Sequence, residues 1–142
     1  MDEAPDGARR WTVERVGEAM VEAFRALPSM PVYSPRRAEF VPVLPGQDLS
    51  PLDVVALSEH VLGRTSLERK TLLVWARSLA SGLSFREQCR ELGWSRATAE
   101  HRRRRACVRL AAEMNQAIDQ AGRALDDLRR SSPQLAECAE RL

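Results

Sequence analysis

Apolar residues recur at helical spacing along most of the chain, and start and stop signals divide them into segments. From Thr12 to Pro28, a stripe of Val, Met, Ala, Phe and Leu follows the three-and-four spacing of one helix face. Thr12 is a typical N-cap, and Pro28 cannot continue a helix. The pattern predicts a first helix between these two residues.

A second helix is predicted from Ser50 to Gly63. Ser50 is a cap residue followed by a proline at the first helical position, which is a strong start signal. The proline-rich segment 28–51 before it excludes a long helix. We expect an extended connector lying on the core there, with a short edge hairpin around Arg36 and Arg37 as the alternative.

A third helix is predicted to begin with the capping-box pair Thr65 and Glu68 and to end at Gly82. Its spacing places five apolar residues on an inward face: Leu67, Leu72, Trp75, Ala76 and Leu79.

A fourth, short helix begins with the same signature at Ser84 and Glu87 and closes at Gly93. Its expected apolar face consists of Phe85, Cys89 and Leu92.

The next start is at Ser95, and the fifth helix is expected to be long. After Arg96 no proline or glycine intervenes until Gly122, so the helix is predicted to reach Arg129 or Arg130. Within it a heptad stripe is formed by Cys107, Ala111, Met114, Ile118, Ala121, Leu125 and Leu128. This stripe over residues 107–128 predicts either a homo-oligomer or a helix packed on its own domain. A short last helix from Pro133 to Leu142 has the weakest pattern.

Composition supports an all-α fold, a helical bundle with a long C-terminal amphipathic helix and a proline-rich connector. The chain has 142 residues, 44% of them apolar, and Ala, Leu and Arg outnumber the strand-forming types. Four segments are expected: a flexible tail at 1–10, N-terminal helices and connector at 11–63, a helix-turn-helix DNA-binding domain at 64–110, and a C-terminal extension at 111–142.

Positive charge is concentrated in residues 64–110, which contain the third and fourth predicted helices and the start of the fifth. The formal net charge is +2, but residues 64–110 contain twelve Arg or Lys and four Glu, which gives +8 locally and leaves −6 for the remainder. A basic segment of this kind indicates an acidic partner such as nucleic acid.

Other function classes find little support in the sequence. The three cysteines show no CxxC spacing, which excludes a typical disulfide framework or zinc site. His60 and His101 have no ligand-spaced partners, and no catalytic constellation or phosphate-binding glycine loop is present. We therefore expect no metal, no cofactor and no enzyme activity. No secretory signal or membrane-spanning run is present, so a cytoplasmic location is expected.

Residues 84–106 have the features of a helix-turn-helix. Such a motif needs a small residue in its first helix, a glycine in the turn and apolar residues around it, as at Cys89, Gly93 and Ala99. Trp75 and Trp94 are expected to pack its core, whereas Trp11 is either a hydrophobic staple for the first helix or an exposed partner contact.

Double-stranded DNA is the partner that this motif predicts, with its second helix in the major groove. The expected base-reading residues are Arg96, Ala97, Thr98, Glu100, His101, Arg103 and Arg104. The expected phosphate-binding residues are Ser84, Arg86, Ser95, Arg102, Arg105 and Arg109. Four successive arginines must point around the whole helix, so they cannot all face one groove.

Residues 84–110 resemble, without gaps, the helix-turn-helix of region four of bacterial primary sigma factors, which reads a promoter element. The resemblance runs through Gly93, Ser95-Arg96 and the closing residues 106–110. Two apolar positions of that pattern are occupied by Ala99 and Arg102 here, and both are departures from it. The resemblance implies a motif that reads promoter DNA, and the two departures argue against carrying over a base preference. The long C-terminal helix is expected to mediate dimerisation or to bind a partner such as RNA polymerase.

A second resemblance covers residues 11–115 and is carried by four short motifs: Trp11-Thr-Val-Glu14, Leu27-Pro28, Leu73-Val-Trp-Ala-Arg77 and Trp94-Ser-Arg-Ala-Thr98. These motifs are similar to an uncharacterised family of short helix-turn-helix proteins of bacteria and their phages or prophages. The similarity implies a helical fold and a mobile-element setting.

The sequence therefore predicts a sequence-specific DNA-binding protein that regulates transcription of bacterial or phage genes. Two alternatives stay open. One is a DNA-packaging adaptor similar to a phage small terminase, and the other is a protein-interaction module that contacts RNA polymerase.

Overall fold

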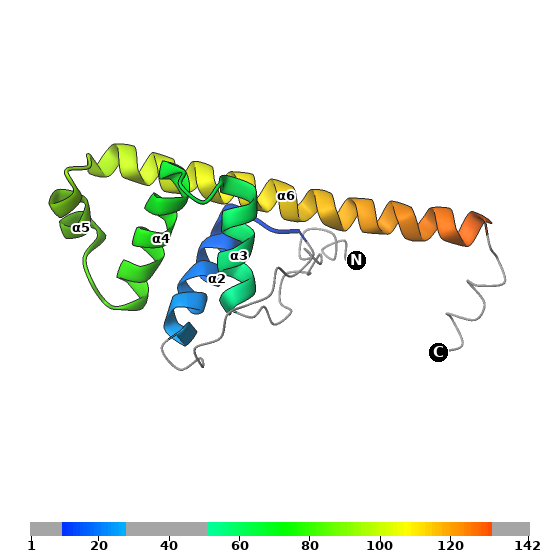
Figure 1. The fold of residues 1–142 in the computed structure, drawn as a ribbon, viewed down its shortest axis with the longest axis horizontal. Coiled ribbons are helices and arrows are strands. Elements are labelled where there is room, and N and C mark those ends of the chain that lie inside the picture. Colours follow the sequence, from blue (N-terminus) through cyan, green and yellow to red (C-terminus); the bar gives the residue numbers. More distant parts are fainter. Residues whose placement is uncertain (1–9, 28–50, 132–142) are drawn as a thin grey trace, which may run out of the picture.

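The computed structural model describes residues 10–27 and 51–131, and these form an all-α bundle of five helices (Figure 1). The helices are α2 (Val13–Ala26), α3 (Pro51–Leu62), α4 (Leu67–Ala80), α5 (Phe85–Leu92) and α6 (Arg96–Ser131). The predicted all-α helical bundle and its long last helix are confirmed. Residues 1–9 of the expected tail, residues 28–50 of the proline-rich segment and the weak helix at 133–142 lie outside the described residues.

Most helix ends lie where the sequence signals place them. The Thr12 hydroxyl accepts a hydrogen bond from the Arg15 amide at 3.2 Å and begins α2. The Ser84 hydroxyl accepts one from the Glu87 amide at 3.3 Å and begins α5. Gly63 follows α3 with φ +92°. Local capping chemistry therefore fixes these boundaries.

The predicted cap of α4 was wrong by one residue. Ser66, rather than Thr65, adopts the extended N-cap conformation and accepts a hydrogen bond from the Arg69 amide at 3.0 Å. The Arg69 guanidinium also donates to the Ser58 hydroxyl and to the Arg64 carbonyl. These bonds hold the first turn of α4 against α3, a tertiary constraint that a local capping-box pattern does not contain.

Helices α2, α3 and α4 all pack against α6. Figure 1 shows it running along the whole bundle with the other three helices crossing beneath it. Its inward face contains Ala106, Cys107 and Leu110, all fully or nearly fully buried, and they contact a core that includes Met20 of α2 and Leu72 of α4. Small side chains at Ala106 and Cys107 allow the other helices to approach closely.

This core joins three of the expected segments. Buried residues of one cluster come from 11–63, from 64–110 and, at Ala111 and Met114, from the C-terminal extension. The described parts of these three segments therefore share one hydrophobic core.

Two predicted apolar faces were wrong in part. Leu67 and Leu79 of α4 are 47% and 45% exposed, whereas the hydroxyl residues Thr71 and Ser78 are buried. Each hydroxyl donates to the carbonyl four residues earlier, which satisfies its donor group within the helix. The buried face of α4 is therefore rotated toward these two residues. Leu92, expected on the inner face of α5, is 41% exposed.

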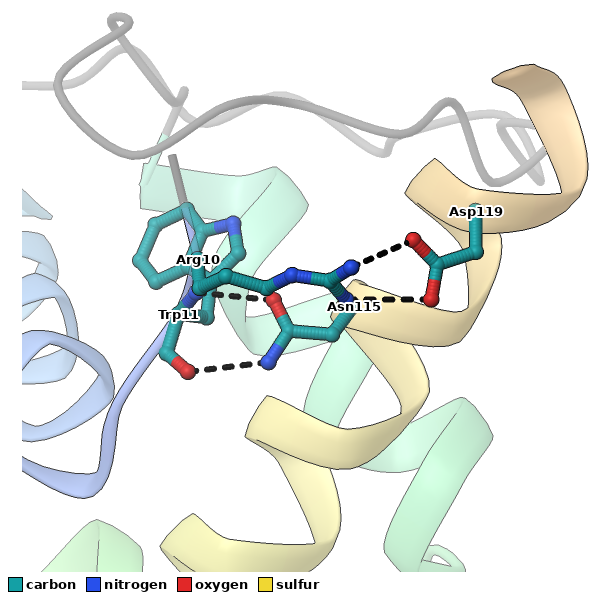
Figure 2. A network of polar contacts seen from close by, with 4 residues as sticks. All are labelled: Arg10, Trp11, Asn115 and Asp119. Atoms are coloured by element: carbon teal, nitrogen blue, oxygen red, sulfur yellow. Dashed lines mark hydrogen bonds and ion pairs between the residues drawn. The ribbon is translucent and has the colours of Figure 1, made fainter. Parts of the chain in front are cut away.

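The chain entering α2 is clamped to α6 by polar contacts (Figure 2). The Asn115 side chain accepts from the Trp11 amide at 2.8 Å and donates to the Trp11 carbonyl at 2.9 Å. Arg10 donates to both carboxylate oxygens of Asp119 at 3.0 and 2.8 Å, and this contact lowers the pKa of Asp119. Trp11 itself is buried in the same core cluster as Val16, which agrees with the hydrophobic-staple prediction and not with an exposed partner contact.

The heptad stripe of α6 divides into two parts. Cys107, Ala111 and Met114 are buried in the bundle's own core, and Ile118 is partly buried against it. All residues from 121 to 131 are exposed, including Leu125 and Leu128. The first half of the stripe therefore packs on its own domain, and an oligomer through this stripe could use only its distal end.

No described helix combines the length and the apolar character that crossing a membrane requires.

Asn115→Ala should destabilise the fold, because it removes the two hydrogen bonds that join Asn115 to the Trp11 amide and carbonyl. The expected cost is roughly 1–3 kcal/mol, measured by thermal or urea unfolding. Gln116→Ala is the matched control, since Gln116 is an exposed neighbour on the same helix. Equal melting temperatures for the two variants would contradict this role of Asn115.

Candidate nucleic-acid interface at the start of helix α6

The first turns of α6 and the whole of α5 form one end of the molecule (Figure 1). A small separate core holds them together, made by Phe85 and Cys89 of α5 and Ala99 of α6. Trp75 of α4 and Trp94 pack against this core, as predicted. Because Ala99 is fully buried and has only a methyl group, α6 lies close to α5 at this point.

The connection between the two helices is short and conformationally demanding. Gly93 caps α5 in the left-handed region at φ +73°, a conformation that side chains with a Cβ rarely adopt. The next amide, of Trp94, donates to the Cys89 carbonyl at 2.8 Å. Glycine at this position therefore sets the direction in which α6 leaves α5.

The four consecutive arginines are distributed around α6 because each residue is rotated by about 100° from the last. Arg103 points inward: its guanidinium lies 4.4 Å from the centre of the Trp75 ring, and its side chain is 18% exposed. It also forms an ion pair with Glu100 at 3.1 Å. Two of the predicted base-reading residues, Arg103 and Glu100, therefore contact each other within the fold.

Arg102 lies along the edge of α6 that faces α4. Its guanidinium is 5.7 Å from the centre of the Trp94 ring, and Nη1 donates to the Thr71 hydroxyl at 3.5 Å. The side chain is partly buried. The guanidinium therefore lies against an aromatic ring, a favourable contact for a cation.

Arg104 and Arg105 point outward. Both are exposed, and no carboxylate of the described residues pairs with either of them. The outward surface of the first α6 turns further contains four exposed residues of the predicted reading set: Arg96, Ala97, Thr98 and His101. Five of the seven predicted reading residues are thus exposed together at this end of α6.

The predicted phosphate-binding residues differ in whether their side chains already have a hydrogen-bond or ion-pair partner. Arg86 of α5 is exposed and unpaired among the described residues. Ser84 and Ser95 both cap helices, with the Ser95 hydroxyl accepting from the Thr98 amide at 3.5 Å. Arg109 forms an ion pair with Glu68 at 3.0 Å and donates to the Val61 carbonyl. Arg109 thus ties α6 to the α3–α4 corner.

Sequence reasoning missed Lys70 of α4. Its ammonium nitrogen lies 6.0 Å from the centre of the Trp94 ring, so it joins the edge of the α6 surface from another helix. The charge excess of residues 64–110 includes Lys70, but only the packing of α4 on α6 brings it to this edge.

Cys89 and Cys107 are both free and buried. Burial raises the pKa of Cys107 and of Cys89, so both thiols are protonated at neutral pH. No group of three or more His, Cys, Asp or Glu lies close enough together in that part of the chain to hold a metal ion.

No protein-family model matches the chain, and neither a curated protein nor a solved structure matches it. Its function has to be inferred from its own residues and their geometry.

Gly93→Ala should destabilise the α5–α6 junction, because alanine in the left-handed region costs roughly 1–2 kcal/mol. Gly122→Ala is the matched control: Gly122 lies within α6, and an added Cβ there meets nothing within 4 Å. That substitution should be neutral or stabilising by up to about 1 kcal/mol. Chemical unfolding of both variants checks the difference, and a neutral Gly93→Ala would show that the left-handed turn is not required.

Proposed function

We propose that the chain is a sequence-specific double-stranded DNA-binding protein and that it regulates transcription of bacterial or phage genes. In this proposal α5 and the start of α6 act as a helix-turn-helix. The observation that carries the proposal is the exposed basic surface of α6, where Arg104 and Arg105 have no carboxylate partner among the described residues.

The dimensions of this surface suit a DNA groove. An α-helix with its side chains is about 10–12 Å wide, and the major groove of B-DNA is about 12 Å wide. The start of α6 lies at the end of the bundle with α5 and α4 beside it (Figure 1), so a duplex can approach without meeting α2 or α3.

The exposed side chains supply the chemistry of base recognition. Arg96 or Arg104 can donate two hydrogen bonds to a guanine, and the methyl groups of Ala97 and Thr98 can contact a thymine methyl. His101 can donate to a base acceptor. Glu100 and Arg103 form an ion pair, and Arg103 also lies against the Trp75 ring. The proposal therefore gives these two residues a structural role instead of a base-reading one.

Phosphate contacts would flank these residues on both helices. Arg105 of α6 and Arg86 of α5 present free guanidinium groups, and the first amides of each helix add donors at the positive end of its dipole. Such contacts position the protein without reading sequence.

Substitution of Arg96 and Arg105 should separate the two roles. Arg96→Ala should change the base preference found by selection from randomised duplexes, because it removes a base contact. Arg105→Ala should weaken binding to all duplexes alike and lower the salt slope of log K by about one unit, because it removes a phosphate contact. A full-length chain that binds no duplex at low salt would contradict the proposal itself.

A DNA-packaging adaptor is the second candidate function, and the exposed distal end of α6 favours it. Leu125 and Leu128 are 48% and 51% exposed on a helix that continues past the bundle. Many copies joined through this end would present several α6 surfaces to one DNA molecule. The same end could instead hold RNA polymerase, which suits a regulator.

Mass measurement in solution distinguishes these functions. A ring of many copies supports the adaptor, whereas a monomer or dimer supports the regulator. If the distal end joins copies, Leu125→Gln combined with Leu128→Gln should reduce the mass to that of a monomer. Leu67→Gln with Leu79→Gln is the control, since these α4 leucines are 47% and 45% exposed and lie away from the distal end. An assembly that persists in the distal double variant contradicts this interface.

A further inference from the structure

Lys70 and Arg102 meet at one aromatic ring. The Lys70 ammonium nitrogen lies 6.0 Å and the Arg102 guanidinium carbon 5.7 Å from the centre of the Trp94 ring. The three residues come from α4, from α6 and from the turn before α6. We call these three residues the Trp94 cluster.

Each member of the Trp94 cluster is placed by the fold. Arg102 donates to the hydroxyl of Thr71, which is fully buried and itself bonded to the Leu67 carbonyl. Lys70 precedes Thr71 on α4, so both cations are fixed relative to the same turn. Trp94 is partly buried against the small core of α5 and α6. The fold therefore holds Arg102 and Trp94 in place, and Lys70 projects from the turn of α4 that carries the Thr71 hydroxyl.

The charge of this cluster is not neutralised within the described residues. Neither Lys70 nor Arg102 pairs with a carboxylate there, whereas the neighbouring Arg103 pairs with Glu100 and Arg109 with Glu68. The face of an indole ring attracts cations, which offsets part of the repulsion between two like charges. The cluster thus places two positive charges within 6.0 Å of one ring centre, and neither has a carboxylate partner among the described residues.

The position of the cluster indicates which anion it suits. Residues 98, 102 and 105 follow one edge of α6 at spacings of four and three, and Lys70 extends that edge onto α4. Ala97, His101 and Arg104 lie on the outward surface beside it. When a helix enters a major groove, its outward surface meets the bases and its edges meet the phosphate backbones on either side.

We propose that the Trp94 cluster binds a backbone phosphate of the duplex into which α6 inserts, which makes α4 part of the DNA interface. This inference rests on the proposed DNA-binding function. It adds Lys70, a residue outside the helix-turn-helix, to the groups that hold the DNA, and it assigns Trp94 the role of positioning both cations.

Lys70→Gln tests this assignment, because Lys70 is exposed and its loss leaves the core untouched. The matched control is Arg25→Gln, which removes the same charge from the last turn of α2, at the end of the bundle remote from α6 (Figure 1). Affinities of the full-length proteins are measured for a selected duplex and for a mixed-sequence duplex, over roughly 50–200 mM salt. Circular dichroism confirms that both variants fold.

Lys70→Gln should weaken binding to both duplexes by about fivefold to tenfold at 0.1 M salt and lower the salt slope by about one unit, as expected for one lost phosphate contact. Arg25→Gln should change neither quantity appreciably. If Lys70→Gln behaves like Arg25→Gln, or weakens binding to the selected duplex alone, the phosphate contact is refuted while DNA binding stands. If the unaltered chain binds no duplex at low salt, the proposed function fails first, and an acidic protein surface becomes the partner for the cluster.

Discussion

The rest of the structure depends on the inward face of α6. Small buried residues along it, among them Ala99, Ala106 and Ala111, let four other helices approach one continuous helix. The same helix thus closes the main core and supports α5 at its beginning. Because its inward face is fixed by this packing, the directions of all its other side chains are fixed as well. The polar clamp of Arg10 and Trp11 on α6 holds the entering chain to the same helix.

This constraint determines what the arginine run can do. A run of four charges in the sequence becomes two pairs in the structure: Arg102 and Arg103 lie against tryptophan rings, and Arg104 and Arg105 face outward. Net charge alone therefore overstates the number of free cations on the helix. The positive surface is nevertheless wider than the helix itself, since α4 contributes Lys70 beside Trp94.

Local chemistry made much of the fold predictable. The caps at Thr12 and Ser84 and the left-handed Gly93 depend on hydrogen bonds and backbone angles within a few residues, and these were found from the sequence. The errors arise where distant contacts decide. The turn that Ser66 caps is also bonded to α3 through Arg69, and Leu67 is exposed because the buried face of α4 is rotated toward Thr71.

The candidate site was predictable as a segment but not residue by residue. The sequence located the exposed end of α6, yet the contact of Arg103 with Trp75 requires knowing that α4 crosses beneath that turn. The assignment of Lys70 requires the same crossing. Helix positions thus follow from short-range patterns, whereas the roles of charged side chains follow from which helix lies opposite.

The most direct test of the central claim is a map of backbone amide chemical shifts as a duplex is added to the full-length protein at low salt. DNA binding through the proposed surface predicts shifts concentrated in residues 95–105, with further shifts around Lys70 and Arg86. Shifts confined to α2, α3 or the distal end of α6, or no shifts with any duplex, would contradict it.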